Sequence, residues 1–532
     1  MAIIVDYKGA MGLTGHMRHW AYNALDCTGT REVAEVLLPR LNEDTERTYA
    51  FERACQSPAM AMMARGVRVN EQALKKALIT AQAGHKAMTK TLNRAKEVEA
   101  VWDGLEKETG FCRVEDGKHK RHKWPRGIPD EDPSKKCEVC GTARMKRSEF
   151  NANSDDQVMH LLYDLYKVPV QLNKKKKASV DKESLLKIKT KFPKVAGLTE
   201  AIIDVRNYKK QIGFLSAKRD ASGRYTSTFN VGAAWTGRFS SSKSPFGEGG
   251  NLQNISERHR NIFEADPGYE MFYADLKTAE SNVVAHLAGD ENYIEAHLTG
   301  DVHTYVTRLL WPDMPWTGDI KKDKKIASGT NPEWDQAPGH NLRFQSKRIQ
   351  HGSNYGLTPP GIALIAHIPQ KAAYEAQGRY FDSFPGIPLW QQKEKLSIKE
   401  EQPLYNPLRR RVKLFGRPWD SHTYKQGLAF KPQSAVADLI DTALWLAWYY
   451  HDPVLLQLLA QVHDAILGQY PIAERDKAIE ALVDCLTIPM DVEDVNGITR
   501  TMVIPVEIAV GKNWGKRDPI NNPNGIDEIE LH

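Results

Sequence analysis

Cysteine is scarce in this sequence, and it has no long uninterrupted apolar run. Six cysteines among 532 residues do not suggest the dense disulfide framework of a small secreted domain. The most apolar stretch, residues 443–450, is interrupted by His451, Asp452 and Pro453, well short of the roughly 20 residues that a membrane span needs. The first residues show no charged leader followed by a long apolar stretch. We therefore expect a cytoplasmic protein without a membrane partner.

Net charge is also low, at +6 from 73 Lys plus Arg against 67 Asp plus Glu, which is little for a nucleic-acid binder. The basic residues are nevertheless clustered, at residues 119–123, 174–177, 321–325 and 409–413. Such clusters can follow a phosphate backbone, whereas solvated surface lysine is the alternative for any single cluster. The length predicts two or three substructures, and 41% hydrophobic and 26% charged residues are typical of a globular protein.

The segment MFYADLKTAESNVVAHLAGD combines a buried strand with a carboxylate at its end. Residues 271–274 are apolar and aromatic, Asp275 follows them, and residues 279–287 have the pattern of a helix with Glu280 near its start. A carboxylate at a strand end is held rigidly while staying open to a cleft. The alternative is that Asp275 is only the N-cap of the helix.

A second acidic residue lies in LLQLLAQVHDAILGQYP, where two apolar runs flank His463 and Asp464. This pattern predicts a β-hairpin with a polar pair at its tip. Because aspartate is common in turns, turn formation alone is the simpler interpretation of Asp464.

A third element, RFQSKRIQHGSNYG, places four polar or aromatic residues at four-residue steps. They are Arg343, Lys347, His351 and Tyr355. On a helix they form one slowly drifting stripe that is unsuited to a hydrophobic core. The stripe suits a polyanion, with the two cations on phosphates and Tyr355 stacking on a base, and a solvated face is the alternative. Gly356 then predicts the end of the helix.

Residues 110–148 are charged, rich in Gly and Pro, and poor in core residues. Cys137 and Cys140 are spaced as a CxxC pair, and Cys112 with either His119 or His122 completes four soft ligands for a structural zinc ion. The alternative is a flexible insertion with free thiols. The remaining cysteines, Cys27, Cys55 and Cys485, are expected to be small core residues.

The order and spacing of these elements resemble the DNA polymerase I family, also called family A. The family's first palm motif has an aspartate and a glutamate five positions apart, matching Asp275 and Glu280. Its finger helix matches the stripe that ends in Tyr355-Gly356, and its last palm motif matches Val462-His463-Asp464. The TGR and NLQNI signatures stand at residues 236–238 and 251–255, and the resemblance covers roughly residue 46 to the C-terminus.

The resemblance implies template-directed DNA synthesis in which a primer 3′ hydroxyl attacks the α-phosphate of a deoxynucleotide. Two Mg²⁺ ions about 3.5–4 Å apart would be held by Asp275 and Asp464. Arg343 and Lys347 would grip the triphosphate, and Lys347 would protonate the leaving pyrophosphate.

The resemblance also assigns roles in selecting substrates. Tyr355 would pack near the new base pair, Glu280 would crowd a ribose 2′ hydroxyl, and His351 stands where the family touches the incoming sugar. The implied DNA contacts are Arg238, Asn251, Gln253, Gln433 and His463. Arg238 and Gln433 would read minor-groove acceptors common to all base pairs, and His463 would lie near the primer terminus.

The implied fold is a right hand of α/β class, mostly helical outside the palm sheet. We expect an exonuclease-like remnant at residues 1–45, a thumb at 46–212, palm at 213–290 and 402–532, and fingers at 291–401. Two positions depart from the family. Ala465 replaces a common glutamate, which leaves the metal preference open, and His351 replaces Phe or Tyr, which leaves sugar selectivity and speed open.

The segment WAYNALDCTG, with residues 22–26, resembles the last motif of the family's proofreading domain. Too few residues precede it to supply that domain's other carboxylates, so we expect no proofreading by this chain. A separate exonuclease chain or other replication proteins are the expected partners, besides primer-template DNA and deoxynucleoside triphosphates. The compact form is like that of bacterial viruses, which would place the protein in the host cytoplasm.

Two other functions stay open. A single-subunit RNA polymerase shares paired aspartates and a Lys…Tyr-Gly helix, but Glu280 and the TGR and NLQNI signatures argue against it. A non-catalytic DNA-binding replication scaffold is favoured by Ala465 and the short N-terminal region. The presence of Asp275, Lys347 and Asp464 together argues against a scaffold.

Overall fold

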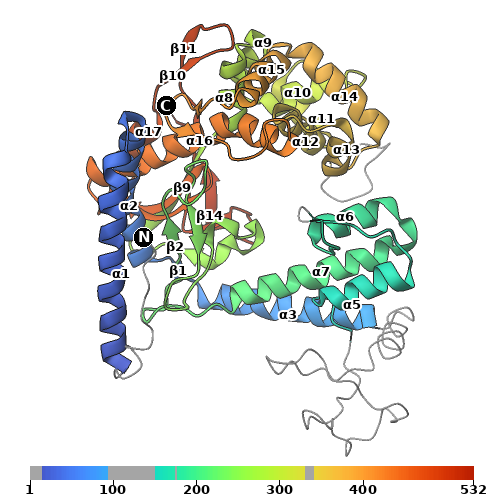
Figure 1. Cartoon of the computed structure of the whole chain (residues 1–532). Coiled ribbons are helices and arrows are strands. Elements are labelled where there is room, and N and C mark those ends of the chain that lie inside the picture. Colours follow the sequence, from blue (N-terminus) through green and yellow to red (C-terminus); the bar gives the residue numbers. More distant parts are fainter. Residues whose placement is uncertain (1–14, 94–149, 174–175, 330–340, 532) are drawn as a thin grey trace, which may run out of the picture.

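The computed structural model describes residues 15–93, 150–173, 176–329 and 341–531, with side chains from residue 23 onward. Figure 1 shows three parts: a sheet-centred body, a group of helices above it, and a helical arm that extends from its base. We call them the palm (the sheet and the helices packed on it), the fingers (residues 291–399) and the thumb (residues 71–93 and 150–215). Both helices and strands build the fold, as predicted for the α/β class.

The palm is built on one twisted sheet, with eight strands in the described chain in the order β1-β4-β13-β14-β12-β5-β9-β8. These strands are β1 (Arg68–Val69), β4 (Phe263–Glu264), β5 (Tyr269–Leu276), β8 (Gln457–Val462), β9 (Ala465–Pro471), β12 (Val506–Gly511), β13 (Asn513–Lys516) and β14 (Gly525–Glu528). Central β5 pairs antiparallel with β9 and β12. Residues at the end of β5 therefore have neighbours on both sides.

Within the described ranges, three two-stranded ribbons accompany the sheet. They are β2 (Thr228–Asn230) with β3 (Ser240–Ser242), β6 (Leu404–Tyr405) with β7 (Arg411–Val412), and β10 (Met490–Glu493) with β11 (Thr499–Met502). All three pair antiparallel. They lie in connections between larger elements, where a short hairpin returns the chain to the palm.

Four helices pack on the palm sheet or on one another beside it: α2 (Glu43–Arg65), α8 (Ala279–Ala288), α16 (Ser421–Tyr449) and α17 (Arg475–Leu486). Helix α16 contacts the other three, and α2 also contacts β8. Buried Cys55, Ala59 and Met62 of α2 belong to the same core as Phe272 of β5. Helix α2 thus packs with the palm, although the sequence places its residues in the thumb.

The fingers consist of seven helices in the described chain. They are α9 (Glu291–Leu298), α10 (Val302–Leu310), α11 (Ile320–Ala327), α12 (Leu342–Asn354), α13 (Pro359–Ala366), α14 (Gln370–Ser383) and α15 (Gly386–Lys399). Their core contains packed aromatic rings, with Tyr293 and Phe384 centroids 4.6 Å apart. The Tyr293 hydroxyl accepts a hydrogen bond of 2.7 Å from Gln350 of α12. This bond ties the rear face of α12 to the finger core.

The thumb packs α3 (Glu71–Asn93) against α7 (Pro193–Leu215), and α6 (Lys182–Lys191) against α7. Helix α5 (Asp155–Met159) continues as a π-helix over residues 160–165. Buried Leu161, Ile188 and Ile202 belong to a cluster separate from the palm core. A core of its own explains why this arm extends away from the sheet in Figure 1.

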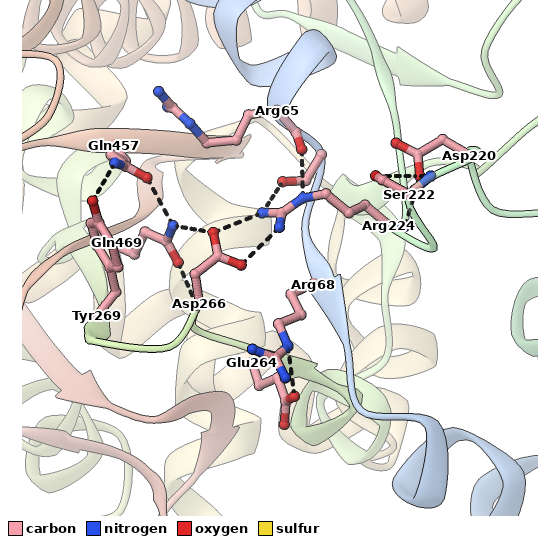
Figure 2. A network of polar contacts seen from close by, with 11 residues as sticks. Arg65, Arg68, Asp220, Ser222, Arg224, Glu264, Asp266, Tyr269, Gln457 and Gln469 are labelled. Carbon is pink, nitrogen blue, oxygen red and sulfur yellow. Dashed lines mark hydrogen bonds and ion pairs between the residues drawn. The ribbon is translucent and has the colours of Figure 1, made fainter.

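A polar network joins the segment that follows thumb helix α7, where Arg224 lies, to the palm sheet (Figure 2). Arg224 makes two hydrogen bonds to Asp266, of 2.7 and 3.2 Å, and a third of 2.7 Å to the carbonyl of Arg65 at the end of α2. Gln469 of β9 donates to the same carboxylate at 2.8 Å and also contacts Gln457 of β8. The network therefore fixes the end of the β8–β9 hairpin opposite its turn.

Helix α1 (Gly15–Leu37) runs along the outside of the palm in Figure 1. It contains residues 22–26 of the exonuclease-like segment. Cys27 on this helix is exposed, so its prediction as a core residue is wrong, whereas Cys55 and Cys485 are buried as predicted. In the described part of the chain, no helix combines the length and apolar character needed to cross a membrane.

Candidate active site

Asp275 stands near the end of β5, one residue before the strand finishes. The preceding residues Met271, Phe272 and Ala274 are buried, which fixes the strand in the palm core. Helix α8 takes Thr278, at φ +49°, as its N-cap residue. The alternative role of Asp275 as a helix cap is therefore wrong, and its carboxylate stays available to the site.

Asp464 lies in the turn between β8 and β9, as the sequence predicts for a hairpin centred on His463 and Asp464. His463 has φ +60°, a backbone conformation that non-glycine residues adopt rarely. The Leu276 amide donates to the Asp464 carbonyl at 3.1 Å, and Asp275 stands opposite Ala465 in the β5–β9 register. The two aspartates, 189 positions apart in the sequence, are thus neighbours at one edge of the sheet.

The charge of the aspartate pair is not balanced by a bonded partner. Burial raises the pKa of Asp275 well above its usual value, and the nearby charges of Asp464 and Glu507 raise this pKa further. Burial also raises the pKa of Asp464. One oxygen of Asp275, Oδ1, is buried without a hydrogen-bond partner in the described chain. Two crowded carboxylates with an unsatisfied oxygen fit a divalent cation bound through oxygen ligands.

Glu507 is a site residue that the motif analysis misses. It stands on β12 directly opposite Asp275, on the side away from Ala465, and pairs with Lys277 at 2.8 Å. The position filled by Ala465 has no carboxylate, while β12 brings one to the other flank of Asp275. Only strand pairing shows this, because 232 residues separate Asp275 from Glu507.

Helix α12 presents the predicted stripe toward this edge. Asn341 caps the helix by accepting from the Phe344 amide at 2.8 Å. Leu342, Ile349 and Gln350 are buried on the rear face, whereas Lys347 and His351 are exposed. The middle of the stripe therefore lies on the open face of the helix, whereas Arg343 and Tyr355 at its ends are half-buried.

The two cations of α12 have different surroundings. Arg343 bonds to Asp301 at 2.9 Å, while Lys347 Nζ has no carboxylate within 4.0 Å in the described chain. The Lys347 charge opposes the rise in the pKa of Asp275. His303 of α10, which the sequence patterns do not indicate, lies near both cations. Burial lowers the pKa of His303 to about 4, and the positive charges of Lys347 and Arg343 lower it further.

At the other end of α12, Tyr355 and Arg238 meet on Glu280. Tyr355 donates to one Glu280 oxygen at 2.5 Å, and Arg238 forms an ion pair with the other. Burial and the Glu280 charge raise the pKa of Tyr355. His351 packs edge-on against the Tyr355 ring at 4.8 Å. Gly356, at φ +68°, follows and ends the helix as predicted.

A cavity of about 910 Å³ lies beside the β8–β9 turn, where His463 lines it, and reaches helix α7 of the thumb. It is lined by parts of α7 and of residues 243–260, and it contains Asn251, Gln253 and His463 of the predicted DNA contacts. Lys210 and Arg260 also line it. The Arg260 guanidinium lies 4.7 Å from the Trp514 ring, and its charge opposes the rise in the pKa of Asp275.

The amide of Gln253 is buried and supports the hairpin turn. It donates to the Phe239 carbonyl at 3.2 Å and to Gln461 Oε1 at 2.6 Å, and Gln461 in turn donates to the His463 carbonyl at 2.5 Å. Asn251 accepts from the Asn254 amide at 3.1 Å and so caps a short 3-10 helix. These two residues hold the backbone beside the cavity.

The structure does not bring every predicted residue to this cavity. Gln433 lies half-buried on α16 and is not among the residues that line it. The expected zinc ligands Cys112, His119, His122, Cys137 and Cys140 fall within residues 94–149, outside the described chain. Within the described ranges, no group of three or more His, Cys, Asp or Glu side chains is placed to hold a metal ion.

Paired acidic strand ends, an open cationic helix and a separate helical arm together make up the fold of a polymerase right hand. Residues 135–516 match the family model described as DNA polymerase family A, and the chain belongs to this family. A solved structure with a similar fold is the POL domain of Pol1 from M. smegmatis, in complex with DNA primer-template and dNTP. Its TM-score is 0.60 at 21% identity, and the match covers 87% of this chain and 70% of that one.

Curated relatives agree with this assignment. DNA polymerase I of Geobacillus stearothermophilus is 28% identical over 386 residues, covering 69% of this chain and 40% of the relative. The thermostable DNA polymerase I of Thermus filiformis is 28% identical over 392 residues, covering 70% of this chain and 42% of the relative. The aligned region thus spans about two fifths of the length of these relatives.

Proposed function

We propose that this protein extends a DNA primer by adding deoxynucleotides directed by a template. The observation that carries the proposal is the meeting of Asp275 and Asp464 at one edge of the sheet, facing the cationic stripe of α12. Acidic side chains hold divalent cations in nucleotidyl transfer, and cations opposite them bind phosphates. Both kinds of group are present around one site.

Asp275 and Asp464 would hold Mg²⁺, which when bound stabilises the attacking and leaving oxygens of the transferred phosphate. Asp275 Oδ1 is free of other hydrogen bonds and can serve as a ligand without losing a partner. The charge of Lys347 acts on Asp275, and Lys347 has no ion-pair partner in the described chain. We assign Lys347 to the phosphates, where it can donate a proton to the leaving pyrophosphate.

Glu280 would select the sugar. Its carboxylate is fixed from two sides, by Tyr355 and by Arg238, so it cannot swing away from a ribose 2′ hydroxyl without breaking both contacts. A rigid wall excludes an added hydroxyl better than a mobile side chain does. The selection of deoxynucleotides over ribonucleotides is also what separates this proposal from an RNA polymerase.

The primer-template duplex would lie along the cavity between palm and thumb. Lys210, Arg258 and Arg260 line it beside His463 and offer positive charge to a phosphate backbone. Asn251 and Gln253 would act on DNA indirectly, because their amides are engaged in holding the cavity wall. Arg238 reaches DNA only by leaving Glu280, so we assign it to the duplex after substrate binds.

Primer extension with the purified chain tests the proposal. We expect Mg²⁺-dependent addition of deoxynucleotides that follows the template, and little addition of ribonucleotides. Asp275→Asn and Asp464→Asn should each abolish extension, while Asp476→Asn on the exposed start of α17 should not. If the wild-type chain binds DNA but never extends a primer, the scaffold function is correct instead.

Three finer proposals accompany this function. The chain lacks proofreading of its own, and strong degradation of a single-stranded primer by purified protein would overturn that. Residues 110–148 bind a structural zinc ion, which metal analysis of freshly purified protein tests. Replication in a cytoplasm, with a separate exonuclease chain as partner, is tested by copurification from the native host.

A further inference from the structure

Helix α11 carries a lysine cluster that the proposed site does not use. Its sequence, IKKDKKIA, has four lysines in eight residues, and all four are exposed. The helix packs against α10 and α12 in the fingers (Figure 1). Most surface lysine runs are only solvated, so the position and surroundings of this cluster have to support any specific role.

The cluster lies beside the phosphate-binding end of α12. Asp301 accepts a hydrogen bond from Arg343 at 2.9 Å, and Lys324 Nζ lies 4.0 Å from its other oxygen. One partly buried carboxylate therefore connects the lysine helix to the arginine that we assign to the triphosphate. Lys321 lies on the same flank as Lys324, because residues three apart share one side of a helix, whereas Lys325 lies between Lys321 and Lys322 around the helix.

The acidic residues near α11 are already engaged. Asp319 caps the helix by accepting from the Lys322 amide. Asp323 is fully buried and accepts from the Thr317 amide and hydroxyl at 2.7 and 2.8 Å and from the Gly318 amide at 3.1 Å. Lys321 and Lys325 have no carboxylate within 4.0 Å in the part of the chain described. The positive charge of this flank is therefore largely uncompensated.

The location distinguishes a polyphosphate from a nucleic acid. Arg343 and Tyr355 are twelve residues apart on α12, or about 18 Å along its axis. The Tyr355 end is closed by Glu280 and Arg238, whereas the Arg343 end is open and cationic. The cavity assigned to DNA is lined by palm and thumb residues and includes none from α11. A compact, highly charged anion at the Arg343 end accounts for these features.

We propose that Lys321 and Lys324 form an outer polyphosphate-binding surface, which captures the phosphates of an incoming nucleotide and passes them to Arg343. Lys324 exchanges its contact with Asp301 for a phosphate oxygen, which also loosens the hold of Asp301 on Arg343. The same surface receives pyrophosphate as it leaves. This inference rests on the proposed function for the ligand being a nucleotide. That the ligand is a polyphosphate follows from the lysine cluster itself.

Helix α11 supplies its own matched control. Residues two apart on a helix are separated by about 200°, so Lys322 points nearly opposite Lys324. Lys324→Gln and Lys322→Gln each remove one exposed charge from the same helix. Single-turnover primer extension should show a Lys324→Gln apparent nucleotide affinity weakened about fivefold, as for one charge roughly 4 Å from a phosphate. Lys322→Gln should change this affinity less than about twofold, because screening weakens distant charges.

The double substitution Lys321→Gln/Lys324→Gln extends the comparison. It should weaken the apparent nucleotide affinity about tenfold and make that affinity less dependent on salt concentration. The maximal rate of extension should change less than the affinity does. Pyrophosphate inhibition, measured on the same variants, tells whether the leaving product uses the surface as well. A change in only one of the two ligands assigns the surface to that ligand.

Two outcomes overturn the proposal. Equal effects of Lys324→Gln and Lys322→Gln would mean that only net charge matters, and weaker primer-template binding with unchanged nucleotide and pyrophosphate affinity would assign the lysines to DNA. Calorimetric binding of inorganic tripolyphosphate to the full chain needs no catalysis. If the wild type binds tripolyphosphate through Lys324 but extends no primer, the proposed function fails while this inference stands.

Discussion

The palm and the fingers carry opposite charge in opposite surroundings. The palm places one acidic side chain near the end of β5 and another in the β8–β9 turn, where burial and neighbouring carboxylates raise their pKa values. The fingers place their cations on exposed faces of α11 and α12, where most have no partner in the described chain. The site therefore has few acidic side chains, which are fixed and close together, and many basic side chains, which are exposed to solvent.

This difference predicts how each half responds to substitution. Buried charges without bonded partners cost stability, so the proposed function predicts that the palm acids serve the reaction and not folding. Exposed cations contribute jointly to one electrostatic potential, so the substitution of a single cation should reduce activity only in part. The comparison fails if a palm acid proves structurally necessary or if a single finger cation is all-or-none.

The largest expected effect follows from Asp275→Asn. We expect the primer-extension rate to fall by about 10³-fold or more, since an electrostatic anchor of the transition state is lost. Burial and the charge of Asp464 raise the pKa of Asp275 to about 8. In metal-free buffer above that pH, where Asp275 is ionised in the wild type, the same variant should therefore have an unfolding free energy about 1 kcal/mol higher. Rapid-quench kinetics and calorimetry measure the two effects, and Asp476→Asn is the control. A destabilised Asp275→Asn would contradict the argument.

The next largest effect concerns Lys347. Lys347→Gln should lower the extension rate about 10²-fold, because this lysine faces the palm carboxylates without a partner of its own. Arg348→Gln is the matched control, since Arg348 is the next residue and its guanidinium lies over the Phe344 ring at 5.2 Å. Similar losses of rate in the two variants would show that the position of Lys347 on the stripe does not matter for extension.

Glu280 should give a smaller and more selective change. Glu280→Gln keeps the side-chain shape but removes the charge that holds Arg238, so discrimination against ribonucleotides should fall about tenfold. Tyr355→Phe, which removes the 2.5 Å hydrogen bond, should shift the same ratio in the same direction. Competition between deoxy- and ribonucleotides on one primer measures the ratio, with Glu295→Gln on exposed α9 as control. An unchanged ratio in both variants would remove Glu280 from sugar selection.

The smallest effect on chemistry, and a clear one on stability, is expected at Asp266. Burial alone would raise its pKa, but hydrogen bonds from Arg224 and Gln469 outweigh burial and hold the pKa below the usual value. Asp266→Asn should cost about 2–3 kcal/mol of unfolding free energy while extension continues. Glu264→Gln, which breaks only the partly exposed pair with Arg68, should cost about 0.5 kcal/mol. Denaturant titration at neutral pH measures both.

The same carboxylate gives a pH dependence with a definite sign. Because the folded pKa of Asp266 lies below the unfolded value of about 3.9, its stabilising contribution is present above that value. The contribution is lost as the pH falls through the folded pKa. Wild-type stability should therefore decline more steeply below about pH 4 than that of Asp266→Asn. Parallel declines of the two proteins would show that the network in Figure 2 contributes little.

Local elements of the site could be predicted from the sequence because their patterns are local. The strand that ends near Asp275, the hairpin around Asp464 and the helix over residues 342–354 are confirmed. Their apolar runs and four-residue spacing determine them without reference to the rest of the chain. The role of Asp275 as a helix cap was an equally local alternative, and the position of Thr278 decides against it.

Features that depend on distant pairing could not be predicted. Glu507 reaches Asp275 only through the register of β12 with β5, and His303 reaches the α12 cations only through finger packing. The placement of α2 on the palm also escaped prediction, because a helix does not reveal which core its buried face joins. The exposure of Cys27 has the same cause. The roles of the assigned site residues stay proposals.

The hydrogen bonds that link Gln253 through Gln461 to the His463 carbonyl have an evolutionary consequence. Two glutamines 208 positions apart share one buried hydrogen bond, and the second of them holds the strained backbone next to Asp464. A change at either glutamine leaves the other with an unsatisfied buried group, so the two positions are expected to covary during divergence. Sequence change in the loop over residues 251–255 is therefore constrained by the β8–β9 turn, which lies far along the chain.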